Sequence, residues 1–167
     1  MDGRSYHSDY FNFTYSLPDG FSEGTERYRQ GILKQTGIRQ STDTFILFHA
    51  DRQLTPNGEP TGGLTIMADN LSGYPKGATE QDYMHHFVTR VMKEKGDDLL
   101  EEGSEVDVAS RKFFRADYRA NGHPLSGYET VMLTFQKGFA LSWAFSAQSK
   151  ADVESAVSSM KQTLLAK

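Results

Sequence analysis

The chain of 167 residues has no cysteine, one tryptophan and no basic excess. Without cysteine there can be no disulfide, thiolate nucleophile or cysteine-based zinc site. No stretch approaches the roughly 18 consecutive apolar residues of a membrane-spanning helix. Because 18 Lys and Arg residues face 22 Asp and Glu residues, the net charge is −4. Proteins built on non-specific phosphate binding are usually basic, so the sequence predicts no nucleic-acid partner.

The remaining composition is typical of a folded domain. Hydrophobic residues make up 37% of the chain and aromatic residues 12%, enough for one core in a chain of this length. The sequence predicts a flexible segment over residues 1–9 and a single domain over 10–167, as a monomer or weak oligomer. Residues 1–9 lack the apolar core of a signal peptide, which leaves two possibilities: a cytoplasmic protein, or an exported one whose leader is absent from this chain.

Apolar and polar residues alternate in several segments, which predicts half-buried strands. The first covers residues 10–17 and ends at the turn sequence Pro18-Asp19-Gly20. Further strands are expected over residues 44–51, 64–69, 104–109, 111–120, 127–136 and 139–147. Lys137-Gly138 separates the last two, which predicts an antiparallel hairpin.

Two segments have the 3.6-residue period of amphipathic helices, residues 79–95 and the segment that follows Ser149. Residues 22–40 are weakly patterned and predict a short helix or an irregular crossing. In the last strand Phe139, Leu141, Trp143 and Phe145 point one way and small residues point the other. A helix can approach the small-residue side closely, and we expect the helix after Ser149 to pack there.

Consecutive strands with short turns, and helices at separate points, predict an α+β fold with one antiparallel sheet of about six strands flanked by helices. The order resembles the PsbP-like fold. The matching features are an aromatic first strand ending in Leu17-Pro18-Asp19-Gly20-Phe21, a mid-chain amphipathic helix, and a terminal hairpin over 128–147 that runs into a helix. The resemblance implies an α/β/α sandwich and a binding or assembly role. No functional residue of the family is carried over.

Motifs of common enzyme classes are absent: the sequence has no phosphate loop, no dinucleotide-binding glycine pattern and no nucleophile elbow. It predicts no cofactor. The favoured contact residues are Arg111, Arg115 and Arg119, which share one strand face with Phe113 and could grip an anionic partner. The alternative is a solvent-facing strand with ordinary cross-strand pairs.

Histidines and carboxylates suggest a second kind of site. Asp82, His85 and His86 are close enough on one helix to hold a metal or sense pH, although a solvated face with Asp82 as a helix cap is the favoured interpretation. His49 and Asp51 share a strand face, where a hydrogen-bonded structural histidine is favoured over a ligand site.

Tyrosines give a further hint. Four tyrosines are expected near element ends or in loops: Tyr6, Tyr10, Tyr28 and Tyr74. They are candidates for an interface, and the alternative is that they border the core.

The sequence favours a non-catalytic binding or assembly module that contacts a protein or small ligand through its sheet face and loops. The alternatives are a small metal-dependent or acid–base enzyme that uses the histidine and aspartate residues, and a purely structural subunit.

Overall fold

The computed structural model describes residues 5–36, 43–57, 60–108, 111–121, 127–163 and 165–166. The helices are α1 (Thr25–Thr36), the 3-10 helix η1 (Leu71–Gly73), α2 (Glu80–Lys95) and α3 (Lys150–Thr163). The strands are β1 (Ser5–Ser8), β2 (Phe13–Ser16), β3 (Phe21–Glu23), β4 (Thr44–Leu54), β5 (Pro60–Asn70), β6 (Asp98–Val108), β7 (Arg111–Ala120), β8 (Gly127–Gln136), β9 (Phe139–Ala147) and β10 (Leu165–Ala166). Among these residues, none of the helices combines the length and apolarity needed to cross a membrane.

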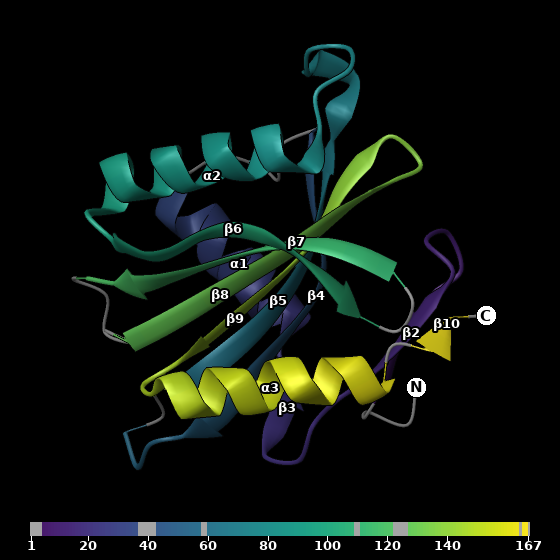
Figure 1. The fold of residues 1–167 in the computed structure, drawn as a ribbon. Helices are drawn as coiled ribbons and strands as arrows, with labels where there is room; N and C mark the ends of the chain where they lie inside the picture. Colours follow the sequence, from purple (N-terminus) through teal and green to yellow (C-terminus); the bar gives the residue numbers. More distant parts are fainter. Residues whose placement is uncertain are drawn as a thin grey trace.

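The main sheet is antiparallel throughout, as the sequence predicts (Figure 1). Its seven described strands run in the order β3-β4-β5-β9-β8-β7-β6, so it is larger than the expected sheet of about six strands. The extra strand is β3, which follows the Pro18-Asp19-Gly20 turn at once and pairs with the end of β4. Strand β9 returns between β5 and β8, which brings segments far apart in the sequence into the centre of the sheet.

The expected first strand over residues 10–17 is not part of the main sheet. The chain instead forms a second, three-stranded sheet in which β1 and β10 both pair with β2. Residues 9–12 form the turn between β1 and β2, and Asn12 takes a positive φ of 52° there. An ordered strand, β1, therefore occupies part of the segment that the sequence predicts to be flexible.

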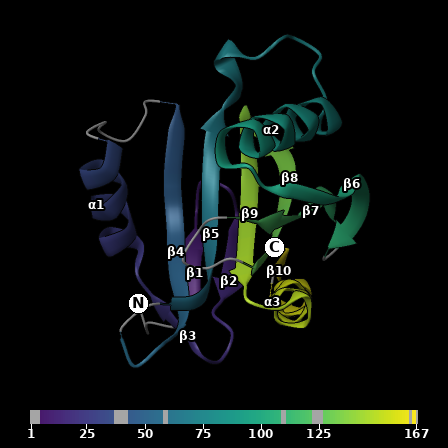
Figure 2. The ribbon, with the colours of Figure 1, turned by 90° about the vertical axis from the view of Figure 1, so that its left-hand side faces the viewer.

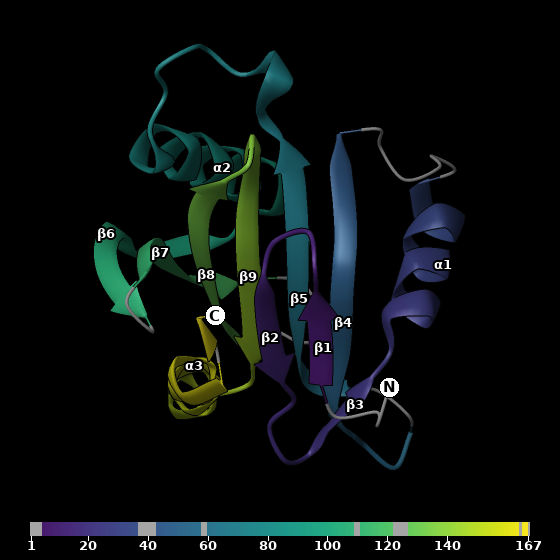
Figure 3. The same cartoon turned by 90° about the vertical axis from the view of Figure 1, so that its right-hand side faces the viewer.

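The two faces of the main sheet differ in side-chain size. The α3 face carries Leu141, Trp143 and Phe145, and the other, the α2 face, carries Ala140, Ser142 and Ala144. The small sheet and α3 cover the α3 face (Figure 3), whereas α2 packs on the other face over β6, β7 and β8 (Figure 2). The result is three layers with the main sheet in the middle.

The expected position of the last helix is wrong. The apolar residues of α3, among them Val153, Val157 and Met160, belong to the same core cluster as Trp143 and Phe145. The helix therefore lies on the face with the large side chains, against β8, β9 and β2. Its approach is possible because it crosses one end of the sheet, beside the small sheet (Figure 1). The layer around α3 is thus completed by aromatic residues of β2.

Helix α1 lies along the free edge of β4 (Figure 2). The Arg29 guanidinium donates hydrogen bonds to the Ile46 backbone carbonyl, and the Gly24 N–H donates to the His49 carbonyl at 2.9 Å. These contacts satisfy groups of β4 that no neighbouring strand pairs, which protects the edge from pairing with another chain. The weakly patterned residues 22–40 thus contain the end of β3 and a 12-residue helix.

Turn and cap chemistry agrees with the sequence. Lys137 and Gly138 take φ angles of 52° and 79°, which a two-residue hairpin turn with the right twist requires. At the start of α2, the Thr79 N–H and hydroxyl each donate to the Asp82 carboxylate at 2.8 Å. The Asp82 N–H donates back to the Thr79 hydroxyl at 3.2 Å. This reciprocal pair is a capping box with aspartate in the place of the usual glutamate, and it makes Asp82 the helix cap that the sequence favoured.

Candidate functional site

The three arginines of the predicted contact stripe lie on the α3 face of β7, and the middle one is used within the chain. Arg115 Nε and Nη2 donate to the two Asp117 carboxylate oxygens at 2.9 and 3.0 Å, and Nη2 also pairs with Glu154 of α3. The side chain of Arg115 is only 16% exposed, and that of Asp117 is 6% exposed. Arg115 therefore ties the sheet to α3 and offers little surface to a partner.

The other members of the stripe differ in exposure. Arg111 donates to the Asn12 carbonyl at 3.2 Å, which joins β7 to the small sheet. Phe113 is 1% exposed and packs edge-on against Trp143, so it belongs to the core. Arg119 is exposed; it donates to the Tyr128 hydroxyl at 3.1 Å, and its guanidinium lies 5.4 Å from that ring. The role of the stripe in binding stays a prediction, and Arg119 is its most accessible member.

Asp82, His85 and His86 lie on exposed positions of α2. The hydrogen bonds from Thr79 lower the pKa of the Asp82 carboxyl, so that group serves as the helix cap. His85 borders a groove between α2 and β6, and His86 meets the edge of the Tyr74 ring. In the described part of the chain, no group of three or more His, Asp or Glu residues is arranged to hold a metal ion. These three residues accordingly do not converge on one point.

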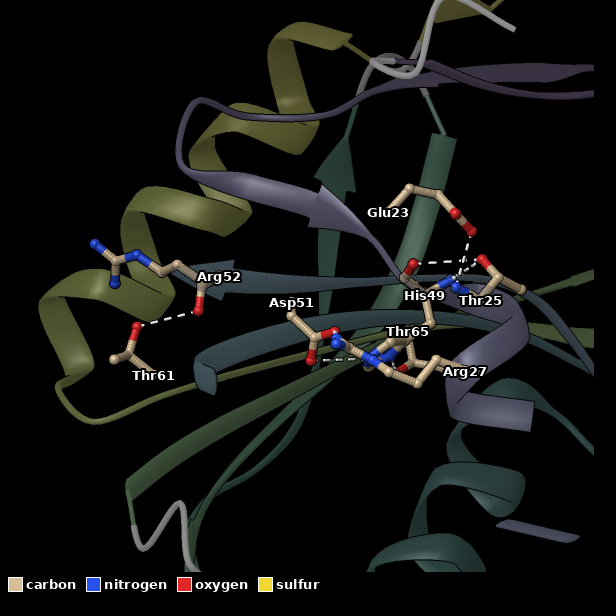
Figure 4. A network of polar contacts seen from close by, with 8 residues as sticks. All are labelled: Glu23, Thr25, Arg27, His49, Asp51, Arg52, Thr61 and Thr65. Carbon is tan, nitrogen blue, oxygen red and sulfur yellow. Dashed lines mark hydrogen bonds and ion pairs between the residues drawn. The ribbon is translucent and has the colours of Figure 1, made fainter. Parts of the chain in front are cut away.

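A buried polar cluster surrounds His49 on the α2 face of β4 (Figure 4). His49 Nδ1 lies 2.9 Å from the Thr65 hydroxyl, and Nε2 lies 3.3 Å from Asp51 Oδ1. Arg27 reaches from α1 to pair with the other oxygen of Asp51. The Tyr28 ring stacks on the imidazole with centroids 3.9 Å apart and an interplanar angle of 12°. A row of polar groups thus joins α1, β4 and β5.

The backbone around this cluster is tied just as closely. The Thr25 hydroxyl accepts from the His49 N–H at 2.9 Å and lies 3.3 Å from the His49 carbonyl, to which it donates. The Glu23 carboxylate in turn accepts from the Thr25 N–H at 2.8 Å. Gly24 completes the junction, because a Cβ there would lie 2.8 Å from the Asp51 carboxylate. A larger residue at this position would have to displace the Asp51 carboxylate that pairs with Arg27.

The chemistry of the cluster follows from its burial. Burial lowers the pKa of His49, although the Asp51 carboxylate opposes that shift, so the imidazole is neutral near pH 7. The order Thr65, His49, Asp51 is the order in which a base activates a hydroxyl nucleophile. However, all three residues are less than 9% exposed, and Tyr28 covers the ring. The arrangement agrees with a structural histidine that fastens α1 to the sheet.

Sequence reasoning missed a cluster of aromatic side chains at the surface, here called the aromatic patch. It lines a pocket of about 450 Å³ between the small sheet and the main sheet, and its large apolar members are Tyr6, Tyr10, Phe11, Phe45, Leu47 and Phe139. Phe139 is central, since its ring centroid lies 6.0 Å from that of Tyr10 and 6.1 Å from that of Phe45. Tyr10 is 56% exposed and Phe45 is 40% exposed.

A β-bulge creates the patch. The pairing of β4 with β5 shifts between Ile46 and Phe48, so Leu47 has no partner in the register. As a result Phe45, opposite Ala68, and Phe48, opposite Ile66, both point to the α3 face. The bulge thus places Phe45 on the α3 face beside the small sheet, where it is 40% exposed. Tyr6 and Tyr10, which were interface candidates from the sequence, lie in the patch.

Comparisons with known proteins identify the fold. No family model matches the chain, and no curated protein matches it. The solution structure of cyanobacterial PsbP (CyanoP) from Synechocystis sp. PCC 6803 superposes with a TM-score of 0.63 at 11% identity, over 98% of this chain and 92% of that one. A crystal structure from Bacteroides thetaiotaomicron VPI-5482 covers all of this chain but 49% of its own, with 17% identity and a TM-score of 0.44. The chain has a PsbP-like fold, and this likeness extends to the fold alone.

Proposed function

We propose that this chain is a non-catalytic binding module whose aromatic patch receives an apolar side chain of a protein partner. The observation that carries the proposal is the exposure of Tyr10 and Phe45 on either side of Phe139. In the described residues three large hydrophobic side chains are exposed, and two of them lie in this one patch. Contiguous exposed apolar surface of this kind is typical of interaction sites.

The shape and composition of the patch support a protein partner. The rings meet edge to face, with interplanar angles of 88° for Tyr10 and Phe11 and 89° for Phe11 and Phe139. Such an arrangement fixes the walls of the pocket, and rigid aromatic walls lose little entropy when an anchor side chain enters. Aromatic residues are also enriched at the centres of protein interfaces.

The border of the patch is polar, as the rim of an interface usually is. The Lys137 ammonium lies 5.0 Å from the centre of the Tyr10 ring, and His7 Nε2 lies 2.8 Å from the Asp9 carboxylate. The Asp9 side chain is 97% exposed. These groups of both signs surround the apolar centre, so a partner can add hydrogen bonds and ion pairs around a buried anchor.

A capture experiment with matched variants tests the proposal. Tagged wild-type protein, Phe45→Ser and Leu100→Ser are incubated with extracts of the source cells, and bound proteins are quantified. Leu100 is the matched control because it is the third exposed large hydrophobic residue, 41% exposed, and lies on β6 away from the patch. We expect a partner whose recovery falls about tenfold with Phe45→Ser and stays unchanged with Leu100→Ser.

Two results would contradict the proposal. One is a partner recovered equally by wild type and Phe45→Ser, with both proteins folded by circular dichroism. The other is the absence of any protein that distinguishes the two variants, which would favour a small-molecule ligand for the pocket. Arg119→Gln provides a separate test of the arginine stripe, since Arg119 is its most accessible member and lies outside the aromatic patch.

A further inference from the structure

A second pocket lies on the opposite face of the same two strands. Its volume is about 170 Å³, and it is formed where β4 begins, β5 ends and α2 passes above them. Thr44 and Asp69 face each other in the pairing of β4 with β5, and both line this pocket. The next pair, Phe45 and Ala68, lines the aromatic patch instead. The two pockets are therefore separated by the thickness of the main sheet.

The helix side of this pocket is one stripe of α2. Tyr83, His86, Phe87 and Arg90 are spaced three, four and seven residues apart, which places them on a single helical face. Arg90 lies 5.8 Å from the centre of the Phe87 ring, and no ion pair within 4.0 Å joins Arg90 to another described residue. The guanidinium and the neighbouring imidazole are thus both available to an anion in the pocket.

The strand side carries the opposite charge. The Tyr83 hydroxyl donates to Asp69 Oδ2 at 2.5 Å, and it keeps its proton because burial and this hydrogen bond raise the pKa of Tyr83. The bond fixes the Asp69 carboxylate at the pocket wall. Asp43 is a second carboxylate of the lining. The pocket thus has carboxylates on its strand side and cationic or polarisable groups on its helix side.

Rings provide the apolar part of the lining. The rings of Tyr74 and Tyr83 are 5.1 Å apart at 43°, and His86 meets the edge of Tyr74 at 6.2 Å. Tyr74 follows η1 directly, so the turn after β5 holds it against α2. A ligand in this pocket would find an anionic wall, a cationic wall and aromatic surface between them.

We propose that this pocket binds a small zwitterion of the size of a free amino acid, whose ammonium group faces Asp69 and whose carboxylate faces Arg90. A volume near 170 Å³ is below the roughly 300–1,000 Å³ of pockets for drug-sized ligands, which favours a small ligand. Guanidinium groups bind carboxylates in a bidentate manner, and an ammonium group forms charge-assisted hydrogen bonds with a carboxylate. A ligand with both groups satisfies both walls, and a simple amine or acid satisfies one.

Titration of the isotope-labelled full chain by NMR tests this inference. The probes are glycine, L-leucine and L-phenylalanine, together with isopentylamine and 4-methylpentanoate, which are leucine without its carboxylate and without its amino group. We expect an amino acid to shift the amide resonances near Tyr74 and Arg90 saturably. Leucine should bind at least about tenfold more tightly than either matched analogue, because each analogue leaves one wall unpaired.

Substitutions test which group of the ligand each wall of the pocket binds. Arg90→Gln should weaken leucine about tenfold and leave isopentylamine unchanged, whereas Asp69→Asn should weaken leucine and leave 4-methylpentanoate unchanged. Lys150→Gln is the control, because it removes one positive charge from α3 on the other face. The inference is overturned if none of the amino acids gives a saturable shift, or if isopentylamine binds as tightly as leucine.

Single substitutions distinguish a failure of this inference from a failure of the proposed function, on which it does not depend. Phe45→Ser alters only the aromatic patch, so the variant should bind leucine as wild type does. Arg90→Gln alters only the second pocket, so it should keep any protein partner of the patch. A variant that loses both activities with its fold intact would contradict the separation of the two sites.

Discussion

Replacing Arg115 with methionine is the sharpest test of how the layers are held together. Arg115 donates two hydrogen bonds to the carboxylate of Asp117, and Asp117 as a whole residue is 4% exposed. After the substitution the Asp117 carboxylate keeps the hydrogen bond from the Thr130 hydroxyl at 2.6 Å but loses its counter-charge. Methionine preserves most of the apolar stem of arginine, so the change isolates the loss of charge.

The expected cost follows from burial. Breaking a buried ion pair by removing one partner costs about 3–5 kcal/mol, and we expect about 3 kcal/mol here because the Arg115 side chain is still 16% exposed. Glu154→Gln is the matched comparison, since Glu154 also pairs with Arg115 but is 43% exposed. An exposed pair contributes about 0.5 kcal/mol. Asp117→Asn in the Arg115→Met background removes the stranded charge and should recover about 2 kcal/mol.

Urea denaturation measures these differences, with fluorescence of Trp143 as the signal. Trp143 is the only tryptophan of the chain and is fully buried in the core, so its emission reports loss of packing. In thermal denaturation followed by the same signal, the expected drop in Tm for Arg115→Met is about 6–12 °C. A cost below about 1 kcal/mol, or no recovery on adding Asp117→Asn, would refute the assignment of Arg115 as a buried tie.

Other predictions address single groups. Tyr15→Phe removes a buried hydroxyl with no hydrogen-bond partner among the described residues, so urea titration should show unchanged stability or a gain of about 1 kcal/mol; a clear loss would reveal a partner. Because burial lowers the pKa of His49 below its unfolded value near 6.5, the unfolded state takes up the proton first as pH falls. Stability should therefore decline as the pH falls below that value, and His49→Gln should flatten this decline; an identical slope in the variant would contradict this. Gly127→Ala places a Cβ against the Ala147 carbonyl oxygen and should cost about 2 kcal/mol by the same assay, whereas a neutral result would show that β8 can shift.

Local patterns predicted those features that depend on neighbours in the sequence. The hairpin turn at Lys137-Gly138 and the cap of α2 by Thr79 and Asp82 each need only a few adjacent residues. Strands β7, β8 and β9 have the predicted bounds, because turn-forming residues such as Asn121 and Lys137-Gly138 mark where the extended segments end. The PsbP-like order of elements was visible for the same reason, since it is a sum of such local signals.

Features that depend on pairing between distant segments were mispredicted. Alternation in β9 separated the large side chains from the small ones but did not say which side α3 would cover. That choice depends on β2, whose Phe13 and Tyr15 pack in the same core as Trp143 and contact α3 on that face. Likewise residues 10–17 alternate as a strand should, yet the turn at Asn12 divides them, because β1 pairs with β2.

The candidate sites also depend on contacts between segments that are distant in the sequence. The arginine stripe was predicted from spacing within one strand, and the spacing is correct, but Arg115 pairs both with Asp117 of its own strand and with Glu154, 39 residues further along the chain. The aromatic patch joins Tyr10, Phe45 and Phe139, which only the return of β9 beside β5 and the bulge at Leu47 bring together. A residue's face can therefore be inferred from its own strand, whereas its accessibility depends on which other segment covers that face. A surface site forms where no other segment covers the face, and for this reason the aromatic patch could be identified only in the folded chain.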